Sequence, residues 1–421
     1  MSDGPANWLQ DMDIPADIFR PQRMDALRLF NRLGIPSARH EEWRFSSLRS
    51  RLKSGVKFVR HSTDSPTSAQ GNSIFQGFTI HVHNGLVSKV VGDLPEGIRL
   101  YSFEDAALLP DFKSYLTPSA NMSDNALWQL NSATFSSGFV LHATGSFGPQ
   151  SVNIIYSSDA TDESSWVQSR GIVVVETKAE LNLRECFSHI GAGIWNHAAE
   201  FYLKENARLV HALIRDTKNK ARLISQQEAH INERALFHTS SFFLNGDYSR
   251  NTTQAYLKGS AAHAEINGVY TVSADQLTDN HVMVDHKVAD CTSSQLFKGV
   301  LDEQSTAVFN GKIFVQPDAQ RTKAYQSSKA VLLSEDCIIH SKPQLEIFAD
   351  DVKCSHGAAI GQLSEHEIFY LRARGIDAET AKSMILNAFV QDVVLAHPDE
   401  EVQSFIEEHL AKQFLPTDYV N

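Results

Sequence analysis

A thiol and an imidazole stand two residues apart near the end of the chain, at Cys354 and His356 in the run SKPQLEIFADDVKCSHGAAIG. The run is typical of a strand, and side chains two positions apart on a strand project from the same face. A thiolate and a neutral imidazole suit iron, zinc or copper, although two ligands do not complete a metal shell. An isolated pair of this kind is more often a buried free cysteine beside a hydrogen-bonded histidine. The pair by itself therefore leaves open a partial metal site and a core thiol.

Longer segments around this pair resemble a known family. The runs DDVKCSHGA (350–358), FYLRARGI (369–376) and AKSMILNAFVQDVV (381–394) resemble the signature of the SufB/SufD family, whose members serve iron-sulfur cluster assembly. The similarity continues upstream through VDHKVADCTSSQLFKGVL and NGKIFVQPDAQRTKAYQSSKAVLLSE, and EEWRFSSL (41–48) is a weaker match to the family's N-terminal signature. Gly357 stands where SufB chains usually carry a glutamate, so the sequence is similar to the SufD branch.

This resemblance implies a fold and a role. It implies a right-handed parallel β-helix that acts as a noncatalytic scaffold, pairs with the similar β-helix of SufB, and binds the ATPase SufC through C-terminal helices. It also implies that His356 ligates iron or a transient iron-sulfur cluster at the SufB/SufD interface, with Cys354 as a weaker ligand or sulfur-handling thiol. No cofactor is then expected to stay bound to the isolated chain. The expected SufC contacts are Phe369, Tyr370, Arg374, Gly375, Ile376 and Met384.

Several properties stay open under this resemblance. They are the nuclearity of the cluster, flavin binding by the assembled complex, and a homodimer of the isolated chain through the same sheet edge. Two other functions also stay open. A SufB-like primary scaffold would carry an acidic residue in place of Gly357. A carbohydrate-active β-helix enzyme would show an acidic groove and activity as a free polypeptide.

The excess of acidic residues limits the kinds of molecule that this protein is expected to bind. The 50 Asp and Glu residues outnumber the 38 Lys and Arg residues, and the formal charge of -12 argues against nucleic acid or an anionic membrane as the partner. The first residues show no basic segment leading into an apolar stretch, and no run approaches the ~18 apolar residues of a membrane span. We therefore expect a cytoplasmic protein with soluble protein partners.

The cysteine spacing and the lack of a nucleotide-binding motif indicate that this chain holds neither a cysteine metal framework nor an ATP site of its own. Cys186, Cys291 and Cys337 are widely scattered with no C-x-x-C spacing, so we interpret them as core residues rather than a disulfide or metal framework. The sequence contains no G-x-x-x-x-G-K-[ST], so ATP hydrolysis is expected in a separate subunit. His281 and His286 are five residues apart and would point to opposite faces of one strand, so they cannot hold a metal together.

Regular spacing predicts the fold of the central region. From about residue 139, short apolar or alternating runs are separated by polar turns, as expected for strands. A small residue that enters a strand recurs at Ala179, Ala207, Ala235 and Ala262, at intervals of 28, 28 and 27 residues. Such a period indicates stacked rungs, and no helical pattern separates the strands. The sequence therefore predicts a mainly β protein with a parallel β-helix over residues 139–363.

The two flanking regions are expected to be helical. Residues 1–138 would form a mixed cap region, with helices over 21–33 and 102–115, a loop at 60–75 and a strand-like run over 78–87. After the second of these helices, at about residue 115, we expect helices largely to stop until residue 364.

Residues 364–421 would form three short amphipathic helices that begin at the caps Ser364 and Asp377 and after Pro398. Because the last rung of a β-helix exposes unpaired backbone groups, we expect this tail to cover it. The predicted apolar face of the second helix is made of Ala381, Met384, Ile385, Ala388 and Phe389.

Overall fold

The computed structural model describes residues 14–414, apart from 53–56, 60–73, 118, 161, 190 and 218–219. The predicted loop at 60–75 lies almost entirely outside the described residues. Among the described residues, no helix is long and apolar enough to cross a membrane.

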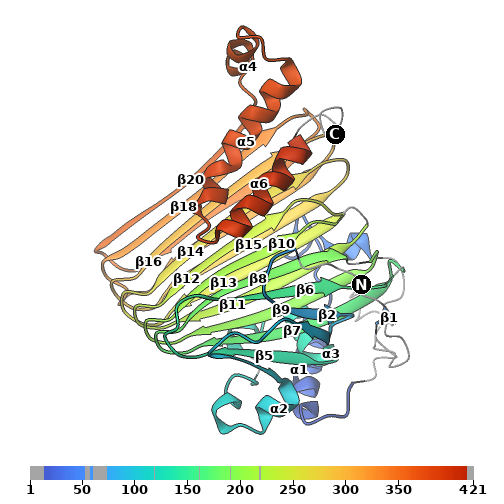
Figure 1. Cartoon of the computed structure of the whole chain (residues 1–421), viewed down its shortest axis with the longest axis vertical. Helices are drawn as coiled ribbons and strands as arrows, with labels where there is room; N and C mark the ends of the chain where they lie inside the picture. Colours follow the sequence, from blue (N-terminus) through green and yellow to red (C-terminus); the bar gives the residue numbers. More distant parts are fainter. Residues whose placement is uncertain are drawn as a thin grey trace.

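Two long sheets face each other and together form a parallel β-solenoid, as predicted (Figure 1). In sheet A the order is β19-β17-β15-β13-β11-β9-β7-β5-β4, and in sheet B it is β20-β18-β16-β14-β12-β10-β8-β6-β2-β3. Each turn of the chain, here called a rung, adds one strand to each sheet. From β5 to β20 every pairing is parallel, because successive rungs stack in the same direction. The strands are β1 (Lys57–Phe58), β2 (Phe78–His83), β3 (Leu86–Val91), β4 (Ile98–Ser102), β5 (Gly138–Ala143), β6 (Gln150–Ser157), β7 (Ser165–Val175), β8 (Glu180–His189), β9 (Ile194–Leu203), β10 (Arg208–Arg215), β11 (Arg222–Ile231), β12 (Leu236–Phe243), β13 (Tyr248–Leu257), β14 (His263–Val272), β15 (Leu277–His286), β16 (Thr292–Leu301), β17 (Thr306–Val315), β18 (Thr322–Leu332), β19 (Ile338–Ile347) and β20 (Val352–Gln362).

The corners between rungs explain the period of 27 to 28 residues. The residue before each recurring alanine has a left-handed backbone, as at Lys178 (φ 64°) and Asn206 (φ 57°). This conformation reverses the chain within a short turn. The next residue, such as Ala179 or Ala207, is fully buried under the corner, so only a small side chain fits. The same pairing occurs at Ala261 and Ala262 and continues with a small thiol at Cys291, which follows Asp290.

The N-terminal region holds more helix than the sequence indicates. Helix α1 (Arg20–Leu33) matches the prediction, whereas α2 (Phe103–Ala107) begins at the predicted Ser102 cap but ends early, because Pro110 disfavours helical backbone in the residue before it. The helix α3 (Ala126–Thr134) was not predicted, and the expectation that helices stop before it is wrong. Eight of its nine residues are buried, so it lacks the amphipathic period that would reveal it.

The strand-like run over 78–87 is a hairpin rather than one strand. Asn84 and Gly85, which both have positive φ, turn the chain between β2 and β3. These are the residues that tight hairpin turns favour. Strand β3 becomes the last strand of sheet B at the N-terminal end of the solenoid.

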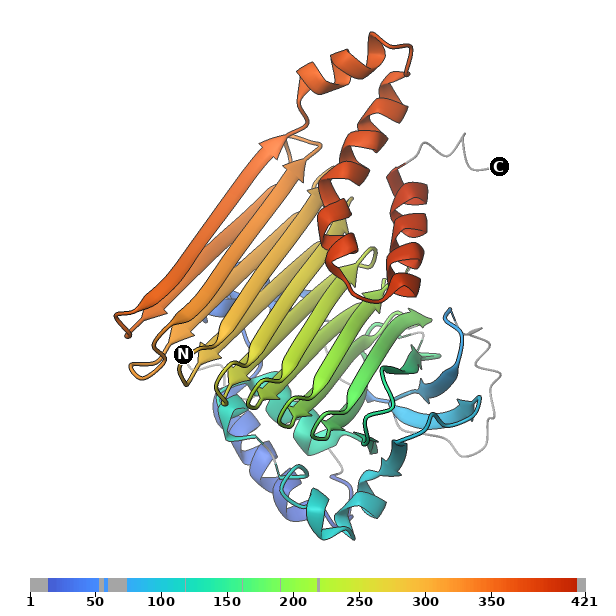
Figure 2. The same ribbon diagram turned by 60° about the vertical axis from the view of Figure 1, so that its left-hand side comes forward.

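The C-terminal tail forms three helices, α4 (Glu365–Arg372), α5 (Ala378–Ala396) and α6 (Glu400–Phe414), and the caps Ser364 and Asp377 accept the expected backbone hydrogen bonds. Its position corrects the prediction. Helices α5 and α6 lie on the outer face of sheet B, and α4 projects past the sheet (Figures 1 and 2). The three described helices of the tail therefore do not cover the open rung.

The buried face of α5 also differs from the prediction. It is formed by Leu386, Val390, Val393 and Val394, which pack with Phe242, Val269 and Val300 of the sheet. Of the predicted face only Ala381 is fully buried, because the first turns of α5 extend toward α4 and away from the strands. Arg184 fixes α6 to the sheet through an ion pair of 2.7 Å with Asp399, both nearly fully buried.

Candidate functional site at the open end of the solenoid

The last rung leaves two strand edges open. β19 ends sheet A and β20 ends sheet B, and among the described residues neither strand has a neighbour on its far side. Ile338, Ile347, Phe348 and Ile360 are exposed there, although each is a type that strands usually bury. An exposed, apolar strand edge is a ready template for pairing with another chain.

Cys354 and His356 lie on the edge strand β20 and share one face of it. In the register with β18, Cys354 lies beside Ala324 and His356 lies beside Gln326. Ala324 and Gln326 are both buried in the space between the two sheets, so the pair continues the inner face of the solenoid. Because no rung follows, His356 is exposed at the mouth and Cys354 is half-buried.

The environment of the thiol differs from that of the imidazole. Cys354 packs at the margin of an apolar cluster that includes Ile313, Val315 and Ala349. Burial raises the pKa of the Cys354 thiol, and a backbone hydrogen bond with Ala324 offsets this rise only in part. The thiol is therefore mainly protonated at neutral pH, whereas only the thiolate binds metal well.

The pair does not form a complete metal site. Within the part of the chain that the structure describes, no group of three or more His, Cys, Asp or Glu side chains is placed to hold a metal ion. Iron and zinc sites need about four ligands. Within the described residues, Cys354 and His356 therefore leave the ligand shell of a metal incomplete.

The glycine after His356 has open space around it. A Cβ placed on Gly357 would meet no heavy atom within 4 Å, and the same holds for Gly361 on the same strand. Gly357 therefore meets no packing requirement. By the alternation along β20, this open space lies on the outer face of the strand, opposite the imidazole of His356.

A second exposed region lies at α4 and the start of α5. Phe369 is 72% exposed, Tyr370 is 56% exposed and Met384 is 48% exposed. The guanidinium of Arg374 lies 3.5 Å from the centre of the Tyr370 ring, and Gly375 has the positive φ that ends the helix. Ile376 is half-buried. None of the eight residues of α4 is buried, so this helix gains little from packing within the chain.

The remaining residues singled out by sequence lie apart from this end. His281 points outward to Asp279, and His286 points inward to Ser293, so the two cannot share a metal, as predicted. Cys186, Cys291 and Cys337 are buried, which confirms them as core residues.

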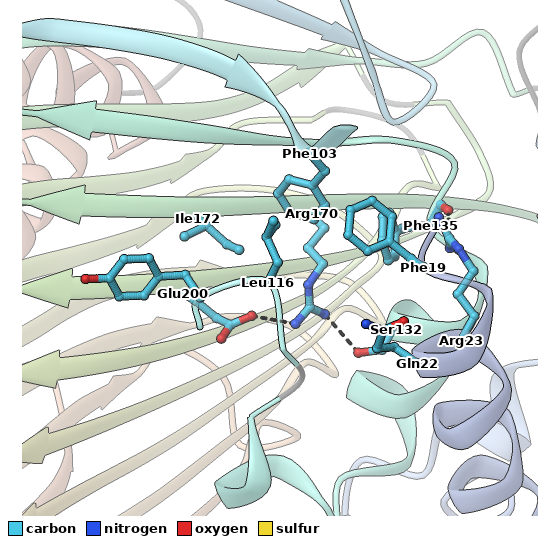
Figure 3. Close-up of a pocket in the computed structure, with 11 residues that line it drawn as sticks. Phe19, Gln22, Arg23, Phe103, Leu116, Ser132, Phe135, Arg170, Ile172 and Glu200 are labelled. Atoms are coloured by element: carbon cyan, nitrogen blue, oxygen red, sulfur yellow. Dashed lines mark hydrogen bonds and ion pairs between the residues drawn. The ribbon is translucent and has the colours of Figure 1, made fainter. Parts of the chain in front are cut away.

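Sequence reasoning missed the buried charges under the N-terminal helices. Arg170 donates to Glu200 at 2.5 Å and to Ser132 at 2.9 Å, beside the rings of Phe19 and Phe103 (Figure 3). Burial raises the pKa of Glu200, and Arg170 opposes that rise. Opposite charges 30 residues apart, close to the rung period, are the signal that could have revealed this pair. Arg170 links α3 to sheet A, and the pair lines a small pocket beside Phe19 and Phe103.

The fold and its open end define a class of protein: a β-solenoid that presents a thiol and an imidazole on its last strand, β20, which pairs with β18 on one side. The family model of the SUF system FeS cluster assembly SufBD core domain matches residues 156–389, which is more than half of the chain. The chain belongs to the SufBD family of iron-sulfur cluster assembly proteins.

Curated relatives are similar to this chain, two of them over nearly its whole length. The iron-sulfur cluster assembly protein SufD of Escherichia coli is 27% identical over 390 residues, which covers 90% of this chain and 89% of the relative. A SufBD family protein of Synechocystis is 27% identical over 393 residues, covering 89% and 86%. A SufBD family protein of Pyrococcus horikoshii is 29% identical over 252 residues, covering 58% and 56%.

Proposed function

We propose that this chain is a SufD-type scaffold subunit, itself noncatalytic, that pairs with a SufB-type solenoid through its open end and binds the ATPase SufC through α4 and α5. The observation that carries the proposal is the exposed imidazole of His356 on an edge strand that has no neighbour among the described residues. The similarity to SufD over nearly the full length supports the choice of branch.

Edge pairing explains how an incomplete ligand pair becomes a site. A partner strand added beside β20 would lie about 4.8 Å away, so that its side chains come within reach of His356 and Cys354. The partner would supply the remaining ligands, and the iron or nascent cluster would be held at the shared seam as cargo. His356 is the primary ligand in this arrangement because it is exposed, whereas Cys354 is half-buried.

The second contact uses the exposed rings of α4. Phe369, Tyr370 and Met384 present apolar area to solvent, and Arg374 lies across Tyr370 as part of the same surface. Aromatic and arginine side chains of this kind dominate binding energy at protein interfaces. Gly375 and Ile376 set the turn between α4 and α5 and so fix the shape of the surface. SufC would bury a helix that the chain itself leaves uncovered.

The metal role is tested with His356→Ala in the complex with SufB and SufC. We expect the three proteins to assemble and the yield of cluster, followed by absorbance and iron content, to fall at least about tenfold, since one ligand is worth more than 1.4 kcal/mol. Ser355→Ala is the matched control, because Ser355 is also exposed but faces away from the inner surface of β20. Full cluster yield with His356→Ala would refute the role of His356.

The SufC contact is tested with Phe369→Ala combined with Tyr370→Ala. We expect loss of SufC from pull-downs with unchanged thermal stability, because neither ring is buried in the chain. Leu108→Ala is the control, since Leu108 is equally exposed but lies near the N-terminal helices. Deletion of everything after Ser364 is a poorer test, because it would also expose Phe242 and Val269 of sheet B. Retained SufC binding by the double variant would place the contact elsewhere.

A further inference from the structure

A polar residue faces inward on every rung from β7/β8 to the open end. The strand registers and the apolar residues that flank these positions place them between the two sheets. Buried apolar columns lie on both sides of this stripe of polar side chains. Burying these polar groups costs free energy unless each one has a hydrogen-bond partner. In chain order its members are Ser169, Glu185, His197, His211, Ser225, Gln227, Thr239, Ser241, Asn251, Thr253, Asn280, Gln295, Gln326, Ser341 and His356.

Some of these groups satisfy one another at the inner end. Glu185 accepts from His211 Nε2 at 3.0 Å and lies 3.4 Å from His197 Nε2. Tyr156 also bonds to Glu185, and Ser169 lies 2.9 Å from His197 Nδ1. We call Glu185, His197 and His211 the inner cluster. All three are within 2% of complete burial, deep inside the solenoid.

Farther along, many polar atoms lack a protein partner. They belong to side chains that are at most 3% exposed, apart from Ser341 in the last rung. Asn251 donates to Ser241 and Gln326 donates to Gln295, but these bonds leave other atoms of the same amides unpaired. Within the described residues of the stripe, the buried atoms with no hydrogen-bond partner are His197 Nε2 in the inner cluster and, farther along, Ser225 Oγ, Gln227 Nε2 and Oε1, Asn251 Oδ1, Thr253 Oγ1, Asn280 Nδ2, Gln295 Nε2, Gln326 Oε1 and Ser341 Oγ.

The distance between successive rungs is one that a single water molecule can bridge. Neighbouring strands lie about 4.8 Å apart, so short polar side chains on successive rungs are too distant for a direct hydrogen bond. A water molecule that accepts from one group and donates to the next spans about 5.6 Å. Buried water in proteins makes such bonds to otherwise unpaired groups.

We propose that the solenoid interior holds a file of hydrogen-bonded water that runs from the inner cluster to the open end beside His356. The file pairs the orphaned hydroxyl and amide atoms, and it gives solvent protons a path to imidazoles that the surface does not reach. Glu185 and its two histidines form one end of this path. The mouth between β19 and β20 forms the other.

A first experiment tests whether water is bound along the stripe, by comparing the stability of variants at two adjacent threonines. Thr253 faces the interior of β13 and Thr252 faces outward. If water bonds to Thr253, then Thr253→Val leaves that water one partner short, and the midpoint of urea unfolding falls relative to wild type. Thr252→Val should leave the midpoint unchanged. If the interior is dry, Thr253→Val removes an unpaired hydroxyl and raises the midpoint, which would overturn the proposal.

A second experiment asks whether the file is continuous. Exchange of the imidazole C2 hydrogen in D2O, followed by mass spectrometry, reports access of solvent to each histidine. We expect Asn280→Leu, which places an apolar side chain midway along the file, to slow exchange at His197 and His211 by at least about tenfold. His238, on the outer face of sheet B, and His397, which ends α5 and contacts it, are equally buried but lie outside the interior, so their exchange should not change.

The matched substitution is Asn310→Leu, at a half-buried position on the outer face of β17. It should affect none of the four histidines. Unchanged exchange at His197 and His211 in the Asn280→Leu protein would show that no path runs through Asn280 and would overturn the proposal. A crystal structure of the wild-type protein with water bound between Asn251 and Asn280 would support it directly.

Discussion

The two ends of the solenoid are built from the same rungs but finish in different ways. At the N-terminal end the chain reverses, and β3 and β4 pair antiparallel with β2 and β5, so the first rungs are covered by strands of the same chain. Phe139, Leu141 and Ile154 are fully buried there. At the other end β19 and β20 are the last strands, and Ile360 stays about half exposed.

This difference shows what a rung gains from its neighbours. An inward side chain in the middle of the stack is covered from both sides by the adjacent rungs, and a side chain in the last rung is covered from one side alone. The N-terminal end obtains its second cover from within the chain. Within the described residues the C-terminal end has no second cover, so ligand residues placed there are available to a partner.

The largest effect should separate a middle rung from the last one. We expect Phe237→Ala in β12 to lower the free energy of unfolding by about 3–5 kcal/mol, because its ring is fully buried between rungs. Ile360→Ala in β20 should cost less than about 1 kcal/mol in the isolated chain, since that side chain is already half exposed. Urea unfolding monitored by circular dichroism measures both. Similar losses for the two variants would mean that the last rung is covered after all.

A smaller effect should appear on acidification, and it arises in the closed part of the solenoid. Burial lowers the pKa of His286 to about 4, while its Nε2 pairs with Ser293 Oγ at 2.8 Å. The unfolded chain takes up this proton near pH 6.5 and the folded chain only near pH 4, so stability is lost as pH falls through that window. His286 alone would account for roughly 3 kcal/mol between pH 7 and pH 4.

Urea unfolding at pH 7 and at pH 5 measures this loss. In His286→Gln the difference between the two pH values should shrink, because glutamine does not titrate. Burial also lowers the pKa of His397 well below its usual range, so part of the loss should remain in His286→Gln.

The repeat could be predicted from sequence because the corner imposes it locally. A left-handed residue followed by a buried small residue recurs at each turn, as at Asn206 with Ala207, and this needs no knowledge of distant contacts. Helix α3 could not be predicted in this way, since it is buried on all sides. The position of the C-terminal helices was also beyond local reasoning. It depends on Arg184 meeting Asp399 across 215 residues of sequence.

In the candidate site, too, the local property could be predicted from sequence and the property that depends on tertiary structure could not. The spacing of Cys354 and His356 predicts that both side chains share a face, because alternation along a strand is local. Their different exposure could not be predicted, because it depends on β20 being the last strand and on the tail lying against sheet B. The sequence predicted that helices would cover the open rung. The packing of Val390 and Val394 on the outer face of the sheet shows why they do not.

The smallest effect is expected at Gly357, and it tests how open the end is. In a middle rung a substituted glycine meets its neighbours, since a Cβ on Gly268 would lie 2.4 Å from the Phe297 ring, whereas a Cβ on Gly357 meets nothing within 4 Å. Gly357→Glu should therefore change the free energy of unfolding by less than about 0.5 kcal/mol, within the usual range for surface substitutions. Gly268→Ala should lower it by about 1–3 kcal/mol through overpacking. Thermal unfolding of the two variants side by side measures the contrast. A large loss for Gly357→Glu would show that the outer face of β20 beside the open edge is already covered by the chain itself.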